Sequence, residues 1–132
     1  LMYLARSLSW HGEKREMAGV IAADVVMHEK PVGRGYVRLA STTAHPWLPP
    51  DSHPDEIPAH EFHYSSLENL DPATRFAYEV KRGHGADGAH DGIVHKNLLA
   101  SYTHLRSAGN CNWAARFAGF ARQRKLLPTP TP

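Results

Sequence analysis

Residues 98–104 read Leu-Leu-Ala-Ser-Tyr-Thr-His, an apolar run that ends in a polar side chain. A short apolar run of this kind predicts a buried strand, and that strand would deliver His104 at its tip. Open α/β sheets place their sites at the carboxyl ends of strands, and histidine transfers protons near neutral pH. A histidine at a strand end is more often structural, so spacing alone leaves both interpretations open.

A second block, residues 60–65, reads His-Glu-Phe-His-Tyr-Ser and also predicts a strand. Because side chains alternate across a strand, this block has two faces. One face holds His60, Phe62 and Tyr64, and the other holds Glu61, His63 and Ser65. We expect one face to be buried. The other face either lines a site or belongs to a charged edge strand packed near one, and the residues do not choose between these interpretations.

The first half of the chain predicts one helix and two strands. Residues 1–10 predict a helix, with leucines at positions 1, 4 and 8 on one face and a His-Gly pair closing it. The apolar residues 17–23 predict a buried strand that residues 25–27 extend or follow. Residues 36–39 alternate as a half-exposed strand does. The five prolines within 44–58 predict an irregular surface loop.

The second half predicts a hairpin and a terminal helix. Residues 76–82 and the strand that begins at position 93 form the hairpin, joined by the glycine- and histidine-rich turn 83–92. Residues 112–127 form the helix, capped by 109–110, with an apolar stripe of Trp113, Phe117, Phe120 and Ala121. The Pro/Thr tail, residues 128–132, is expected to be disordered.

Three stretches of this sequence resemble one known family. Residues 99–104, the 60–65 block and the Leu-Met-Tyr-Leu of residues 1–4 are similar to the glutaminase domain of cobyrinic acid a,c-diamide synthases. The resemblance implies an α/β fold, namely the C-terminal part of a class I glutamine amidotransferase (flavodoxin-like, three-layer) domain over residues 1–127. In that family the segment matching residues 1–4 directly follows a Cys-Gly-Gly nucleophile turn. We therefore expect the chain to be truncated just after its nucleophile.

The resemblance also assigns roles to single residues. It makes His104 the catalytic base and His60, Glu61, Tyr64 and Tyr102 site-neighbouring residues. Ordinary glutaminase triads carry a glutamate two residues after the histidine to orient its ring, and here that place is Arg106. Related corrinoid amidases also lack this glutamate, which points to their branch of the superfamily. What orients the ring of His104 stays open.

The single cysteine offers a competing dyad. Cys111 lies seven residues after His104, near the start of the terminal helix, where the helix dipole favours a thiolate. No glycine elbow positions its sulfur for attack, however. A bystander thiol is the favoured interpretation.

Composition narrows the function classes. The chain has 132 residues, 42% of them hydrophobic, and a formal charge of +2 without a basic stripe, which argues against nucleic-acid binding. It has no apolar run of about 18 residues, so no membrane span is expected. We expect a cytoplasmic location. Among ten histidines only His60 and His63 have short ligand spacing, and a strand would point them to opposite faces. No metal site is expected.

The resemblance implies a glutamine-hydrolysing carbon–nitrogen ligase that amidates tetrapyrrole side-chain carboxylates in cobalamin biosynthesis. It implies ATP and Mg for the full-length enzyme, in a missing N-terminal synthetase domain, and none for this chain, which has no phosphate-binding loop. We expect the chain alone to be inactive and to expose an apolar edge that makes it aggregate or associate, a homodimer being one form. Three alternatives remain: a sirohaem or sirohydrochlorin amide synthase, a non-catalytic assembly subunit of the same fold, and a histidine-based metal binder.

Overall fold

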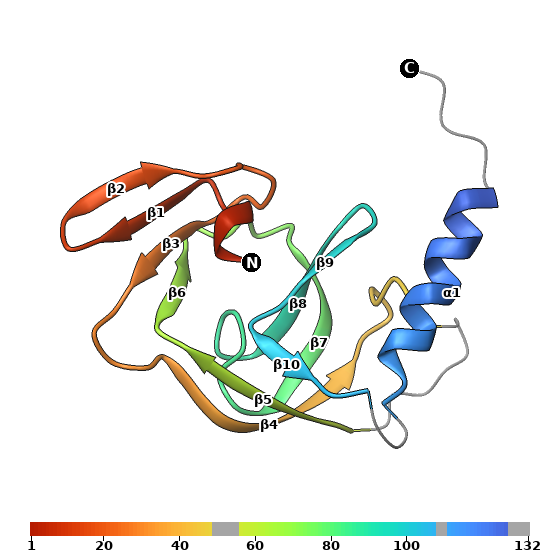
Figure 1. Ribbon diagram of the computed structural model, residues 1–132. Coiled ribbons are helices and arrows are strands. Elements are labelled where there is room, and N and C mark those ends of the chain that lie inside the picture. Colours follow the sequence, from red (N-terminus) through yellow and green to blue (C-terminus); the bar gives the residue numbers. More distant parts are fainter. Residues whose placement is uncertain (49–55, 108–110, 127–132) are drawn as a thin grey trace.

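The computed structural model describes residues 1–48, 56–107 and 111–126 (Figure 1). Its elements are two sets of strands, one short 3₁₀ helix and one α-helix. In chain order they are η1 (Met2–Leu4), β1 (Ser7–Trp10), β2 (Glu13–Glu16), β3 (Asp24–Met27), β4 (Gly33–Ser41), β5 (Ile57–His63), β6 (Ser65–Glu68), β7 (Arg75–Arg82), β8 (His90–His95), β9 (Leu98–Ala100), β10 (Thr103–Leu105) and α1 (Trp113–Leu126).

The strands form two sheets. The four-stranded sheet has the order β2-β1-β3-β6, and the six-stranded sheet has the order β10-β5-β4-β7-β8-β9. Strands β1 and β3 are parallel, and the other pairs described are antiparallel. Mixed sheets accompanied by a helix agree with the α/β class that the sequence predicts.

The helix predicted over residues 1–10 is wrong except for its first turn. Only η1 is helical, and β1 then pairs with β2, with Trp10 opposite Glu13. The turn between them consists of His11 and Gly12, whose φ angles are 48° and 80°. Two positive φ values in a two-residue loop characterise a type I′ hairpin. From sequence alone the same His-Gly pair predicts the end of a helix, because glycine suits both structures.

The strand predicted over residues 17–23 is also wrong. This segment is irregular, and the neighbouring strand is β3, at the place of the proposed extension. Gly19 has a φ of 67°, which breaks an extended backbone. The N–H groups of Ala18, Gly19 and Ile21 instead donate to the carbonyls of residues 3–5. The apolar run therefore packs against the chain start without joining a sheet.

The other predicted strands are present. Strand β4 contains the 36–39 segment, β5 contains most of the 60–65 block, and β7 and β8 form the predicted hairpin. The predicted 44–58 loop is irregular at residues 44–48 and gives way to β5 at Ile57, while residues 49–55 lie outside the described part.

Residues 98–104 do not form one strand. They form β9 and the start of β10, which lie at opposite edges of the six-stranded sheet. Only Ser101 and Tyr102 stand between them, and we call these two residues the crossing segment. The three Cα–Cα steps from Ala100 to Thr103 span at most roughly 10 Å. The sheet must therefore curl until its two edges approach each other (Figure 1).

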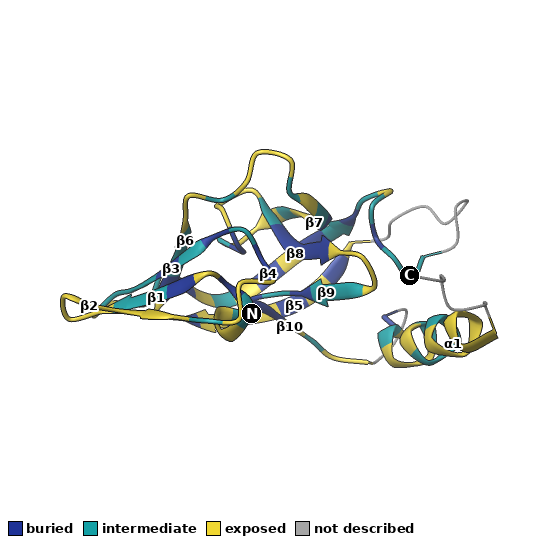
Figure 2. Cartoon of the chain, turned by 90° about the horizontal axis from the view of Figure 1, so that it is seen from above, coloured by how far each residue is buried: buried dark blue, intermediate teal, exposed yellow. Residues whose placement is uncertain are grey.

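The terminal helix α1 packs loosely. Of its predicted stripe, Trp113 packs against the core of the six-stranded sheet, and Phe117 contacts Trp47 with ring centroids 5.0 Å apart. Figure 2 shows that α1 is mostly exposed, and it has no fully buried residue. The cap predicted at 109–110 and the tail at 128–132 lie outside the described residues. Across the described helices, none has the length and apolar character that a membrane span requires.

Two hydrophobic clusters hold the sheets. The larger lies under β4, β5 and β7 and includes Val37, Leu39 and Tyr78. The smaller joins Ile21 and Ala23 to Ile93 and Ala100, so it connects the chain start to β8 and β9. Between them they bury both sides of β8, which also carries the completely buried Asp91.

Candidate active site

A pocket of about 330 Å³ lies where the chain start, the end of β5 and the crossing segment meet. Aromatic, aliphatic and polar side chains line it together: Leu1, Met2, Met27, Phe62, His63, Tyr64, Ser65, Ser101, Tyr102 and His104. These residues are far apart in sequence: the first two residues of the chain line the pocket together with residues beyond position 100. Three stretches quoted from the sequence, residues 1–4, 60–65 and 99–104, therefore converge on one cavity.

His104 is the central residue of the short strand β10. It pairs directly with His60 of β5, and the two ring centroids are 6.5 Å apart. The His60 ring in turn lies 6.1 Å from that of Tyr36 on β4. His104 is exposed, and within the described part of the chain its ring forms no hydrogen bond or ion pair with a carboxylate. His104 is thus an exposed residue that lines the pocket.

The two faces of the 60–65 block, which runs from the end of β5 to the first residue of β6, are divided as the alternation predicts. Glu61, His63 and Ser65 are buried, while Phe62 and Tyr64 are 50% and 36% exposed. The polar side chains thus point inward and the aromatic ones outward, the reverse of the usual pattern. Buried polar groups need partners, so this face must carry a hydrogen-bond network.

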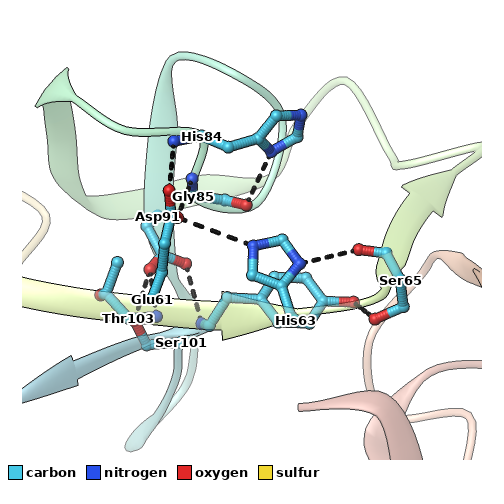
Figure 3. Close-up of polar contacts among 9 residues, drawn as sticks. Glu61, His63, Ser65, His84, Gly85, Asp91, Ser101 and Thr103 are labelled. Carbon is cyan, nitrogen blue, oxygen red and sulfur yellow. Dashed lines mark hydrogen bonds and ion pairs between the residues drawn. The ribbon is translucent and has the colours of Figure 1, made fainter. Parts of the chain in front are cut away.

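Glu61 is the centre of that network (Figure 3). Its carboxylate accepts hydrogen bonds from the backbone N–H groups of His84 and Gly85, each at 2.8 Å. His63 donates from Nδ1 to the carbonyl of Ser65 at 2.9 Å, since a carbonyl only accepts. The Nε2 atom of His63 lies 3.6 Å from the Glu61 carboxylate and has no hydrogen-bond partner among the described residues. The network holds the β7–β8 turn against β5.

Tyr102 connects the crossing segment to this network. Its ring stacks on that of His63, with centroids 4.0 Å apart and planes at 13°. Its hydroxyl lies 2.7 Å from Ser65 Oγ, and Ser65 donates onward to the sulfur of Met2 at 3.3 Å. Burial raises the pKa of Tyr102, so its hydroxyl stays neutral near pH 7 and serves as a hydrogen-bonding group. Tyr102 thereby links residue 2 to β10.

Asp91 holds the backbone of the crossing segment (Figure 3). It is completely buried, and its carboxylate accepts hydrogen bonds from Ser101 Oγ at 2.7 Å, Thr103 N at 2.9 Å and Tyr102 N at 3.2 Å. The sequence reading missed this residue. The available signal was an Asp-Gly pair directly before the apolar Ile93 and Val94, where a buried carboxylate needs nearby donors.

The remaining predicted site residues lie around the pocket at different depths. Tyr64 and Tyr102 line it together with His104, whereas His60 is the cross-strand neighbour of His104 and Glu61 lies on the opposite face of β5. Arg106 is exposed, one residue after β10.

Cys111 lies elsewhere. It is 7% exposed and packs in the larger hydrophobic cluster beside Trp113, and it does not line the pocket.

No group of three His, Cys, Asp or Glu residues in the described part of the chain has the arrangement of a metal site. The pocket lining contains no carboxylate side chain, so its residues do not fit a Mg–nucleotide group either.

Comparison with known proteins shows which family this chain resembles. Residues 1–110 match the CobB/CobQ-like glutamine amidotransferase domain. Curated proteins named cobyrinate a,c-diamide synthase are similar to the chain in Magnetococcus marinus (45% identity over 98% of this chain), Halobacterium salinarum (41% over 80%) and Archaeoglobus fulgidus (34% over 95%). These matches cover 27%, 23% and 26% of the three relatives. The chain thus spans about a quarter of the length of the curated relatives it matches.

Proposed function

This chain belongs to the CobB/CobQ-like glutamine amidotransferase domain family, and from that premise we propose that it is the carboxyl-terminal part of a glutaminase domain with His104 as the catalytic base. The complete protein would be an ATP-dependent tetrapyrrole amidase of the cobyrinate a,c-diamide synthase kind. It would transfer glutamine-derived ammonia to side-chain carboxylates in cobalamin biosynthesis.

One observation carries the proposal: Leu1, Met2 and His104 line the same pocket. In the resembling family the nucleophilic cysteine directly precedes the segment that matches residues 1–4. A thiol at that position in sequence would adjoin the pocket that His104 lines. Nucleophile and base must come within hydrogen-bonding reach of each other for this chemistry.

The reaction then follows in two halves. His104 takes the thiol proton as the sulfur attacks the carbon of the glutamine carboxamide, and the tetrahedral intermediate places its negative charge on the former carbonyl oxygen. The C–N bond breaks as the imidazolium returns the proton to the nitrogen, which leaves as ammonia. In the second half His104 takes a proton from water as the water oxygen attacks the thioester carbon. The C–S bond then breaks, the imidazolium returns the proton to the sulfur, and glutamate leaves. Backbone donors for the oxyanion would come from residues next to the nucleophile.

The acceptor half of the reaction lies outside this chain. ATP and Mg, bound by the proposed synthetase domain, would supply the activation of the acceptor carboxylate, and the pocket described here would contribute no residue to that step. By itself the chain has a base without a nucleophile, so we expect no glutamine hydrolysis from the purified 132-residue polypeptide. Detectable ammonia release from glutamine by this polypeptide would contradict that expectation.

The decisive test uses the complete protein with two nitrogen sources. The substitution His104→Ala should lower glutamine-dependent amidation about 10²- to 10⁴-fold, while free ammonia, which bypasses the glutaminase site, should still support amidation. The matched control is His95→Ala, an exposed histidine at the end of β8 that does not line the pocket. This control should leave both activities unchanged.

The same experiment separates the alternatives. Equal glutamine-dependent rates in His104→Ala and the unsubstituted protein would reject His104 as the base. An unsubstituted protein that amidates with ammonia but not with glutamine would favour a non-catalytic assembly subunit. Amidation of a sirohydrochlorin-type macrocycle in preference to cobyrinate would keep the glutaminase chemistry and change the acceptor.

A further inference from the structure

The crossing segment has a structural problem that a regular sheet does not pose. Strands β9 and β10 are consecutive in sequence but lie at the two edges of the six-stranded sheet. The two residues between them leave one edge and enter the other, so they cannot continue the hydrogen-bond ladder of either. Buried backbone N–H groups in such a segment need other acceptors.

Asp91 supplies the acceptors. Its two carboxylate oxygens take the N–H groups of Tyr102 and Thr103 and the hydroxyl of Ser101, and the side chain is completely buried. Within the described residues no cation forms an ion pair with it. The buried carboxyl group is held here by three donors of one chain segment.

The bonds to Asp91 hold the first residue of β10 as well as the crossing segment. Thr103 begins β10, and β10 has only three residues paired with β5: Thr103 with Glu61, His104 with His60, and Leu105 with Ala59. So short a strand determines its own register weakly. A slip of one residue would turn His104 from the exposed face, which it shares with its partner His60, to the buried face, because strand side chains alternate. The bond from Thr103 N to Asp91 sets the residue at which the strand starts.

We propose that Asp91 is a positioning residue for His104: by fixing residues 101–103, its carboxylate sets the register of β10 and so aims the imidazole into the pocket. This inference rests on the proposed glutaminase function. It assigns to a residue of β8 the task that a glutamate two residues after the histidine performs in ordinary triads. Asp91 performs it through the backbone, because its oxygens bond the crossing segment and not the ring.

The test compares Asp91→Asn with Asp24→Asn in the complete protein. Asp24 is a carboxylate of the four-stranded sheet that also accepts several hydrogen bonds, from Ser7, Asn69 and Arg6, but it has no contact with the crossing segment. Asp91→Asn keeps the size of the side chain and places a donor where an acceptor is needed. We expect it to lower the kcat for glutamine hydrolysis about 10- to 100-fold, with the KM for glutamine changed less than about 2-fold. Ammonia-dependent amidation should persist.

Asp24→Asn is expected to change neither kinetic constant. Equal losses of kcat in the two variants, or a folded Asp91→Asn protein with undiminished kcat, would overturn the positioning role. Should Asp91→Asn fail to fold, Ser101→Ala removes a single one of the three bonds and is expected to lower kcat about 3-fold at unchanged KM. An unsubstituted protein that hydrolyses no glutamine would overturn the proposed function itself, and the positioning role with it.

Discussion

Asp24 of the four-stranded sheet and Asp91 of the six-stranded sheet each accept several hydrogen bonds, and the two carboxylates differ in what they hold. Asp24, in the four-stranded sheet, accepts bonds from the side chains of Ser7, Asn69 and Arg6 and has Lys14 at 3.7 Å. These interactions, the Ser7 hydroxyl first, hold the pKa of Asp24 well below its usual value of 3.8. Asp91, in the six-stranded sheet, has two backbone N–H groups and the Ser101 hydroxyl as partners and lies fully inside the protein.

The difference separates electrostatic from geometric roles. Side-chain partners such as Arg6 and Lys14 rearrange when Asp24 changes, because they lie near solvent. The backbone partners of Asp91 belong to a segment that must cross from one sheet edge to the other. A carboxylate such as Asp24 mainly stabilises the cationic side chains around it. A carboxylate such as Asp91 determines where a strand begins. We therefore expect changes near Asp91 to cost more than matched changes near Asp24.

The largest difference should come from a pair of glycines. Gly92 follows Asp91, has a φ of 70°, and an added Cβ would lie 2.7 Å from the buried ring of Tyr78. Gly92→Ala should therefore destabilise the chain by about 3 kcal/mol, through backbone strain and overpacking together. Gly12→Ala in the β1–β2 turn, where φ is 80° and no atom lies within 4 Å of the added Cβ, should cost about 1 kcal/mol. Urea unfolding of both variants measures the difference, and equal midpoints would contradict the comparison.

A smaller difference is expected from two tyrosines. Tyr102→Phe removes the buried hydroxyl that bonds Ser65 and should lower the free energy of unfolding by about 1.5 kcal/mol. Tyr3→Phe serves as the matched change, because Tyr3 is 74% exposed and should shift stability by less than about 0.5 kcal/mol. The two free energies come from the same urea titration. A Tyr102→Phe variant as stable as Tyr3→Phe would show that the crossing segment does not depend on this bond.

The two sheets should also respond to acid over different pH ranges. His45 packs against the six-stranded sheet, accepts a bond from Trp47 N at Nδ1 and contacts the Tyr78 hydroxyl at 2.9 Å through Nε2. Burial lowers the pKa of His45 from 6.5 to about 4. The unfolded chain therefore binds a proton in this window and the folded chain does not, so stability falls as the pH drops from about 6.5 to 4. Replacing His45 by Gln should flatten the slope of unfolding free energy against pH there, and an unchanged slope would exclude His45 as its source.

Asp24 should respond in a lower window and with the smallest effect. Because its pKa is lowered in the folded chain, its contribution is complete above about pH 4 and is lost as the pH falls further. Its partners are partly solvated, which weakens the effect, and salt should weaken it more. The stability of Asp24→Asn should vary less with pH below about 4 than that of the unsubstituted chain. Parallel curves for the two proteins would contradict this assignment.

The sequence predicted those elements whose signals are local. The β7–β8 hairpin and the alternation of β5 follow from short periodic patterns, and both are present. The strand pairing of β1 could not be predicted, because the His-Gly pair at 11 and 12 suits a helix end and a type I′ turn equally. The break at Ser101 and Tyr102 could not be predicted either, since the carboxylate that holds this segment lies ten residues from Ser101 in sequence. Local propensity says nothing about such a contact.

The pocket shows the same limit. The sequence reading singled out His104, Tyr102 and Tyr64, and these three lie together at one cavity. It did not indicate that Ser65 forms hydrogen bonds with Tyr102 and Met2. Nor did it indicate that Asp91 accepts hydrogen bonds from the backbone next to His104. Those relations depend on the curl of the six-stranded sheet, which arises from long-range pairing.

A double-mutant cycle in the complete protein tests the central claim most directly, because it asks whether Asp91 acts through His104. The glutamine-hydrolysis rate is measured for the unsubstituted protein, Asp91→Asn, His104→Ala and the protein with both changes. If Asp91 works by aiming the imidazole, Asp91→Asn should cost about 10- to 100-fold alone and less than about 2-fold when His104 is already alanine. The same fold-loss in both backgrounds would contradict the account, since Asp91 would then support activity independently of His104.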